Sequence, residues 1–238
     1  MFSLLHRQTS ISIGKLLVTD INIDLLNKKD EHSPSQQLTE NLRISGYQYV
    51  IGAASKSNKA NRLIMNTALP IRTVRLYDIE DDLEELLDSE DVETLGTNYV
   101  LIKGNWTIPS SHLEDGILRL QLNGYTPILA KSERYECLQD NYRNISRLLN
   151  RGCLLETDLI SLTGYHGQGS KRLAYKLFKE GWTSFVGSGA SNLIEQEMVN
   201  TLLQSKRIVK RLESLPLRNK ELWETTVKNT STTMTLLS

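Results

Sequence analysis

Ten residues stand where runs of β-forming residues end, and their types decide what chemistry the chain can support. They are Asn22, Asp24, Ala53, Ser55, Lys103, Lys131, Glu133, Arg134, Gly189 and Ser191. In parallel α/β folds, catalytic and binding side chains gather at the carboxyl ends of the strands, so these positions are the candidates for a site. The set contains no histidine and no cysteine, so it lacks the usual zinc ligands and the usual base for a nucleophile.

Arg134 lies in the stretch SERYECL, which ends one predicted strand and opens a predicted helix. An arginine beside a helix N-terminus can hold a phosphate or carboxylate through two parallel hydrogen bonds. An ion pair of Arg134 with Glu133, or with a residue of a neighbouring strand, explains the same residue equally well. Both interpretations stay open from the sequence.

Other motifs are weaker. The stretch GYHGQGSK, residues 164–171, has the glycine spacing of a phosphate loop, but it ends in Ser-Lys where that loop needs Lys followed by Ser or Thr. It therefore predicts a glycine loop that leads into a helix capped by Ser170. The remaining candidates for ligands or nucleophiles are scattered, without ligand or relay spacing, and are read as surface histidines and buried cysteines: His6, His32, His112, His166, Cys137 and Cys153.

The elements that must position these residues follow a repeated strand–helix pattern. Seven β-rich runs cover residues 15–22, 47–53, 71–77, 99–104, 126–130, 153–158 and 183–187. Apolar residues at helical spacing fill 79–87, 117–122, 138–149, 173–178 and 193–212. Glycines that suit left-handed helix ends precede four of the strands: Gly46, Gly124, Gly152 and Gly181. The pattern predicts an α/β fold with parallel strands, as a closed (β/α) barrel or an open doubly wound sheet.

Length and charge limit the function classes. The 238 residues suit one domain, which we place at 16–222, with an N-terminal tail at 1–15 and a polar C-terminal tail at 223–238. The 28 basic and 28 acidic residues give no net charge, which argues against a nucleic-acid partner. No apolar run approaches the length of a membrane span, and the N-terminus does not read as a signal peptide, so we expect a cytoplasmic protein.

Several long blocks resemble one known family in the same order along the chain. LQLNGYTPILAKSERY is similar to a stretch that ends there in H-P-E-R-Y, and RGCLLETDLISLTGYHGQG matches closely. VTDINIDLL lies over an opening D-x-H-x-H-L-L, and FVGSGASN over D-x-H-N. From Val18 to about Leu222 the chain thus resembles the PHP-domain protein-tyrosine phosphatases of bacterial capsule and exopolysaccharide loci, the CpsB type, and especially those of Bacteroidota.

The resemblance implies a distorted seven-stranded (β/α)7 barrel, a TIM-like PHP barrel, with a cluster of divalent metals, usually manganese, that activates a hydroxide against phosphotyrosine. This chain departs from the family at the ligand positions. The residues there are Asn22, Asp24, Ser55, Lys103, Lys131, Gly189 and Ser191, and only Asp24, with the nearby Asp20, could offer a carboxylate. Two ammonium groups beside a dication would repel it. We therefore expect no metal cofactor.

The function predicted from these departures is that of a non-catalytic relative, a pseudophosphatase. Lys103, Lys131 and Arg134 would then bind phosphotyrosine or another anion without cleaving it, in capsular or exopolysaccharide tyrosine phosphorylation. Expected partners are the tyrosine-phosphorylated tail of a kinase, an active phosphatase paralogue or further copies of the same chain. The alternative is an active metal-dependent protein-tyrosine phosphatase, a hydrolase, with a reduced site. A third possibility is a stable fold without a ligand.

Overall fold

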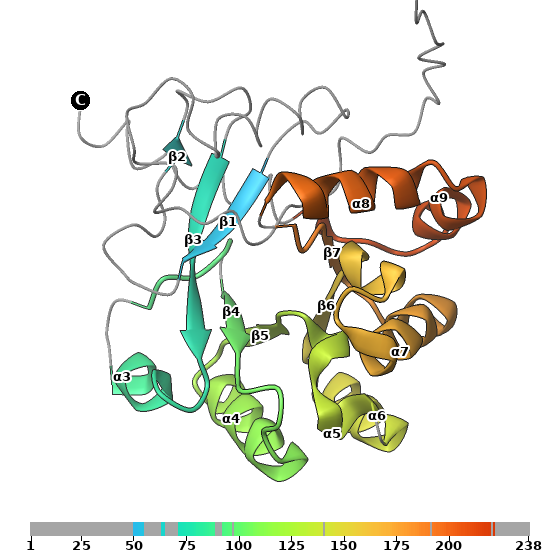
Figure 1. Cartoon of the computed structure of the whole chain (residues 1–238). Coiled ribbons are helices and arrows are strands. Elements are labelled where there is room, and N and C mark those ends of the chain that lie inside the picture. Colours follow the sequence, from blue (N-terminus) through green and yellow to red (C-terminus); the bar gives the residue numbers. More distant parts are fainter. Residues whose placement is uncertain are drawn as a thin grey trace, which may run out of the picture.

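A parallel sheet forms the centre of the molecule. The computed structural model describes residues 50–54, 63–64, 71–88, 92–96, 98–139, 141–190, 192–219 and 221. Hydrogen bonds join six parallel strands in the order β1, β3, β4, β5, β6, β7. Their bounds are Val50–Ala54, Ile71–Asp78, Tyr99–Lys103, Thr126–Leu129, Leu154–Asp158 and Phe185–Gly187. The two-residue β2 (Leu63–Ile64) pairs antiparallel with β3 (Figure 1).

Helices and 3-10 turns follow β3 and each later strand. Their bounds are α3 Leu83–Asp88, α4 Ser110–Leu122, η3 Ser132–Arg134, α5 Glu136–Gln139, α6 Tyr142–Asn150, η4 Leu159–Thr163, α7 Gly167–Glu180, α8 Leu193–Leu203 and α9 Lys206–Glu213. From β3 onward, each crossover advances the sheet by one strand, so sheet order follows chain order. This confirms the predicted α/β class with parallel strands.

The described residues show the parallel α/β sheet but not the closed seven-stranded barrel. Six of the seven predicted runs contain the parallel strands, whereas the first run, 15–22, lies outside the described residues. Within the described part of the chain, β1 and β7 are the two ends of the parallel order, so the sheet is not closed there. Gly124, Gly152 and Gly181 have positive φ angles after α4, α6 and α7, as predicted, and Gly46 lies outside the described residues.

Two helix predictions need correction. Residues 193–212 form two helices, α8 and α9, which are separated at Gln204 and Ser205. Helix α7 begins at Gly167 after His166, so Ser170 is not its N-cap. Ser170 is instead buried in the first turn, where its hydroxyl oxygen lies 3.2 Å from Nε2 of Gln139.

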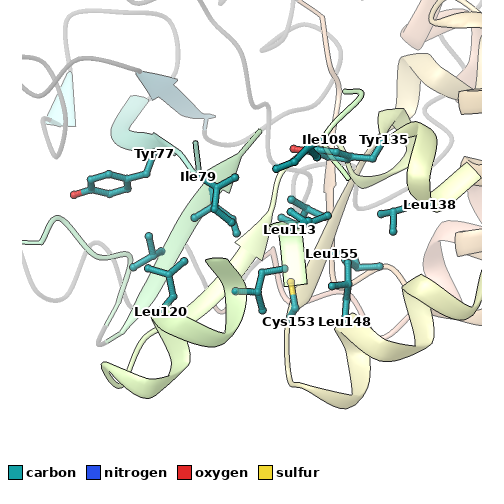
Figure 2. Close-up of a cluster of buried hydrophobic side chains, with 14 of the residues drawn as sticks. Tyr77, Ile79, Ile108, Leu113, Leu120, Tyr135, Leu138, Leu148, Cys153 and Leu155 are labelled. Atoms are coloured by element: carbon teal, nitrogen blue, oxygen red, sulfur yellow. The ribbon is translucent and has the colours of Figure 1, made fainter. Parts of the chain in front are cut away.

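Buried apolar side chains hold the helices to the sheet. In the largest cluster, Val100, Ile102, Leu129 and Leu155 of the strands pack with Leu113, Ile117 and Leu120 of α4 and with Ile145 and Leu148 of α6. Figure 2 shows Leu113 and Leu120, with Leu138, Leu148 and Leu155, in this cluster. Burial of apolar area supplies the main stabilisation. Cys153 belongs to the cluster as an apolar residue, and Cys137, half-buried, packs against it.

The chain after α9 returns to the sheet at β7. Nδ2 of Asn219 donates to the carbonyl oxygen of Val186 (2.7 Å), and Oδ1 of Asn219 accepts from the N–H of Val186 (3.0 Å). Both groups are buried. The Asn219 amide therefore satisfies the backbone of β7 as a neighbouring strand would.

In the parts of the chain that the structure describes, no helix is long and apolar enough to cross a membrane.

Candidate functional site

The carboxyl ends of four neighbouring strands bring charged side chains to one edge of the sheet. Asp78 ends β3, Lys103 ends β4, Lys131 follows β5, and Asp158 ends β6. Asp78 and Lys103 are register partners in the β3–β4 ladder, which places them side by side. We call this edge the mouth of the sheet.

Lys103 forms an ion pair across the mouth. Its Nζ lies 2.8 Å from Oδ2 of Asp78, with 34% of the Lys103 side chain and 18% of the Asp78 side chain exposed. Burial acts to raise the pKa of Asp78. The hydrogen bonds from Lys103 and the N–H of Glu80, together with the charge of Lys103, outweigh it and hold this pKa below its usual value. The Asp78 carboxylate is therefore ionised and committed to protein donors.

Lys131 has a left-handed backbone conformation, with φ 53° and ψ 44°. It is the one non-glycine residue with positive φ in the described ranges. This conformation costs on the order of 1–2 kcal/mol for a residue with a Cβ, so something must hold it. The N–H of Lys131 donates to Oε2 of Glu156 at 2.7 Å, and the hydroxyl of Ser132 donates to the carbonyl oxygen of Glu156 at 2.9 Å. Glu156 thus fixes the loop that carries Lys131.

Glu133 lies beneath the mouth and does not pair with Arg134. It is fully buried, and its Oε1 accepts a 2.6 Å hydrogen bond from the Ser161 hydroxyl. Its Oε2 lies 3.4 Å from the backbone nitrogen of Asp158. Burial, and then the charge of Asp158, raise the pKa of Glu133 to about 8. The interpretation of Arg134 as an ion-pair partner of Glu133, which the sequence allowed, is therefore wrong.

Arg134 rests on an aromatic side chain. Its Cζ lies 4.0 Å from the centroid of the Trp106 ring. Trp106 in turn meets Tyr135 edge-on, with ring centroids 5.3 Å apart, and the Tyr135 hydroxyl accepts from the N–H of Gly104 at 2.9 Å. The Arg134 guanidinium is therefore positioned by a cation–π contact with Trp106.

Gly189, after β7, makes room for Asp158. A Cβ at position 189 would lie 2.6 Å from both Cγ and Oδ2 of Asp158, closer than side-chain atoms approach. The φ angle of Gly189 is 68°, which also favours glycine. The Asp158 carboxyl group thus occupies the space beside the β7 loop that a side chain at 189 would need.

The described side chains do not fit a divalent metal. A divalent metal needs several anionic or imidazole ligands that converge on one point. No group of three or more His, Cys, Asp or Glu residues is so arranged in the ranges that the structure describes. Asp78 is already paired with the Lys103 ammonium, which would repel a dication. Four of the predicted ligand positions lie outside the described residues: Asn22, Asp24, Ser55 and Ser191.

Lys103 and Lys131 lie at the ends of adjacent strands, as predicted. Three acidic residues that were not predicted as site residues also lie at the mouth. These are Asp78, Glu156 and Asp158, at the ends of β3 and β6. A signal for them was present, because Asp78 directly follows the run IRTVRLY and the run CLLETD itself ends in acids. Their partners depend on strand register, which the sequence does not display.

Comparisons with known proteins agree on one family. The model described as capsular polysaccharide synthesis, CpsB/CapC, matches residues 39–213. Tyrosine-protein phosphatase YwqE of Bacillus subtilis (strain 168) is 30% identical over 148 residues, which cover 59% of this chain and 56% of YwqE. The putative tyrosine-protein phosphatase CapC of Staphylococcus aureus is 25% identical over 168 residues, 66% of this chain and 64% of CapC. The matched regions thus span less than two thirds of either relative.

A solved structure shares the fold. It belongs to work on YwqE from Bacillus subtilis and CpsB from Streptococcus pneumoniae, described there as unique metal-dependent tyrosine phosphatases. The TM-score is 0.57 at 20% sequence identity, and the alignment covers 85% of this chain and 95% of that one.

Proposed function

The chain belongs to the CpsB/CapC family of capsular polysaccharide synthesis proteins, and we propose that it is a member that binds a phosphorylated partner without hydrolysing it. The observation that carries the proposal is the Lys103–Asp78 ion pair, 2.8 Å long, at the mouth. The Lys103 ammonium stands where the resemblance implies a glutamate ligand, and it pairs with the neighbouring carboxylate of Asp78. Without a metal to lower the pKa of water, no hydroxide attacks the phosphate at neutral pH.

The anion site of this proposal uses Lys131 and Arg134 more than Lys103. The charge of Lys103 is largely offset by Asp78, whereas Arg134, whose Cζ lies 4.0 Å from the centroid of the Trp106 ring, has a planar guanidinium that suits a bidentate phosphate contact. Trp106 also offers an aromatic surface against which a phenyl ring could pack. Phosphotyrosine combines these two chemistries, an aryl ring and a dianion, and is therefore the ligand that we propose.

The rest of the proposal follows from the family. YwqE and CapC are described as tyrosine-protein phosphatases, one of them putatively. We propose that this chain meets the tyrosine-phosphorylated tail of a kinase, or an active phosphatase paralogue, in the cytoplasm. We also propose that the whole chain forms the distorted seven-stranded PHP barrel that the resemblance implies.

Catalysis is tested first. The purified protein is assayed on a chromogenic aryl phosphate with and without manganese, and its metal content is measured by elemental analysis. We expect no turnover above buffer and less than stoichiometric metal. Manganese near one equivalent with metal-dependent turnover would reject the pseudophosphatase and establish the alternative, an active phosphatase with a reduced site.

Binding is tested separately, by titration of a phosphotyrosine peptide at low salt. Lys131→Ala and Arg134→Ala are each expected to weaken binding about 10-fold, because each removes a charge-assisted contact. Arg147→Ala is the matched control, since Arg147 lies in α6 and contacts Glu114 of α4. Flat titrations for the wild type, or equal losses for Arg147→Ala, would remove the binding proposal and favour a fold without a ligand.

A further inference from the structure

A groove lies between α7 and α9, on elements other than those that form the mouth. Its volume is about 620 Å³, and it is lined by Tyr175, Phe178, Lys179, Arg207, Ile208, Lys210, Arg211 and Ser214. Phe178 and Ile208 line the groove and are otherwise buried in the core. Tyr175 is 45% exposed and extends this apolar surface. The floor can therefore accept an apolar side chain.

The rim of the groove is basic. Lys179, Arg207, Lys210 and Arg211 are all exposed. Arg211 reaches from α9 to α7, where its Nη2 donates to the carbonyl oxygen of Lys179 at 2.6 Å and bridges the two helices. The nearby Glu180 pairs with Lys176 at 3.0 Å and also feels the charges of Lys179 and Arg211, so it offsets part of the rim charge and leaves the four basic residues in excess. An occupant that combines an apolar anchor with surrounding acids would match this groove.

The same chain carries such a surface on α3 and α4. Leu122, in the last turn of α4, is 77% exposed, the largest value among the exposed apolar residues described. Arg119, one turn earlier on the same helix, is held by Glu84 of α3 through two hydrogen bonds of 2.7 Å. Asp88 and Asp115 lie close enough to Arg119 to raise its pKa further, after the hydrogen bonds of Glu84. Leu122 thus lies beside a cluster in which acids outnumber the single arginine.

Charge is segregated on a larger scale too. Residues 78–88 contain Asp78, Glu80, Asp81, Asp82, Glu84, Glu85 and Asp88 and no lysine or arginine. Helix α9 has the opposite character, with Lys206, Arg207, Lys210 and Arg211 against Glu213. Figure 1 places α3 and α4 on one side of the sheet and α9 at the other end of the molecule. Each copy therefore carries an acidic surface on α3 and α4 and a complementary basic surface on α9. These two surfaces are too far apart to contact each other within one copy.

We propose that the α7–α9 groove binds a second copy of this chain, with Leu122 seated on the floor and the acids of α3 and α4 facing the basic rim. Such a contact joins two different surfaces and is therefore heterologous. In an open chain of copies, each end copy keeps one of the two surfaces unoccupied. Copies then add head to tail, as a ring or a short open chain. One leucine anchor and screened charges make the contact weak and dependent on salt.

Sedimentation velocity of the full chain tests this contact. We expect the average mass to rise with concentration up to about 100 μM at low salt, as a micromolar contact requires, and to fall on addition of salt. Leu122→Ser removes the anchor and Arg207→Glu/Lys210→Glu reverses the rim. All three residues are exposed, so folding is checked by circular dichroism and is expected to be unchanged. Each variant alone is expected to stay monomeric. Tyr142→Ser, an exposed aromatic on α6, is the control that should associate like the wild type.

A mixture of the two defective variants gives the sharpest result. The Leu122→Ser protein retains an intact groove, and the rim variant retains Leu122, so one contact can form between the two proteins. The surfaces that remain after this contact are the mutated ones, so no further copy can bind. We expect the mixture to give a dimer that grows no further. A wild-type protein that stays monomeric at every concentration, or a mixture that does, overturns the proposal. Binding of wild-type protein to polyglutamate or to anionic vesicles under those conditions would assign the groove to a different occupant.

Discussion

Two buried carboxyl groups lie next to each other under the mouth, and one of them holds a proton at neutral pH. Glu133 is fully buried beside Asp158, and its pKa rises from 4.5 to about 8, first through burial and then through the Asp158 charge. The bond from Ser161 opposes this shift without cancelling it. Glu133 is therefore a neutral group in the folded protein over most of the physiological range.

This proton makes stability depend on pH. The unfolded chain releases it above about pH 4.5, whereas the folded protein keeps it up to about pH 8. The folded state binds more protons between these values, so the free energy of unfolding falls as pH rises through this window and levels off above it. Glu133→Gln cannot ionise and should flatten the decline by on the order of 2–4 kcal/mol, as measured by urea unfolding from pH 5 to pH 9. Parallel curves for the two proteins would contradict this assignment.

The glycine after β7 is a second sensitive residue. Gly189→Ala would place a Cβ 2.6 Å from Asp158, and its φ of 68° is strained for alanine. We expect a loss of about 2–4 kcal/mol of unfolding free energy, the sum of backbone strain and overpacking. Gly181→Ala is matched in backbone, with φ 71°, but its Cβ would meet nothing within 4 Å. It should lose only about 1 kcal/mol, and equal losses at the two sites would show that the contact with Asp158 has no cost.

The residue types in the sequence predict only part of this site. Lys103 and Lys131 were predicted at the mouth because strand ends of a parallel sheet share one edge. The Asp78–Lys103 pair could not be predicted, since it depends on the register of β3 against β4. The partner of Glu133 was also missed, because Ser161 lies 28 residues further along the chain and meets it only through the β5–β6 crossover.

Strand β7 is completed on its second edge by a side chain. The strand has three residues, and in the described sheet it pairs with β6 alone. Asn219 supplies one donor and one acceptor to Val186, both buried. On the edge of β7 that does not pair with β6, these two hydrogen bonds replace the backbone hydrogen bonds of a neighbouring strand.

Removal of the Asn219 amide should therefore destabilise the protein through β7. Asn219→Ala leaves a buried N–H and a buried carbonyl of Val186 without these partners, at a cost of roughly 2–4 kcal/mol in chemical unfolding. The amide of Val186 should also exchange with solvent faster. Asn123→Ala is the control, because Asn123 also donates to a backbone carbonyl, that of Arg119 (2.9 Å), but at an exposed site. It should change stability by no more than about 0.5 kcal/mol, and a similar effect for both variants would argue against the role of burial.

Helix boundaries were predicted less well than strand positions. Short apolar runs marked six strands because strands buried on both faces need continuous apolar residues. The break between α8 and α9 was missed, since Gln204 and Ser205 include neither glycine nor proline and the apolar spacing continues across them. The start of α7 was placed too late for a related reason, because Gly167 and Gly169 are poor helix formers that this fold nevertheless places in the first turn.

At the scale of the whole molecule, zero net charge conceals an uneven distribution. Acids dominate residues 78–88 and bases dominate α9, although the totals of 28 and 28 cancel. With no net repulsion between copies, attraction between unlike surfaces decides how the protein behaves in solution. The totals follow from composition alone, whereas this arrangement in space depends on the positions of α3 and α9 in the fold.

Solubility should therefore be lowest near pH 7 and low salt. We expect light scattering to show net attraction between molecules there, and loss of that attraction at pH 9 or after addition of about 0.5 M NaCl, which shortens the Debye length to a few ångströms. The Arg207→Glu/Lys210→Glu variant has a net charge of −4 by the same count and should scatter as a repulsive protein at low salt. Attraction that persists at high salt would point to apolar contacts in place of charge.

The contact between Gly189 and Asp158 also restricts how this lineage could change. Any residue with a side chain at 189 needs the room that Asp158 now fills, so a substitution at 158 has to come first. The reverse order passes through a crowded and less stable intermediate. An acidic side chain on the loop after β7 would therefore need a second change, at position 158, to be accommodated without loss of stability.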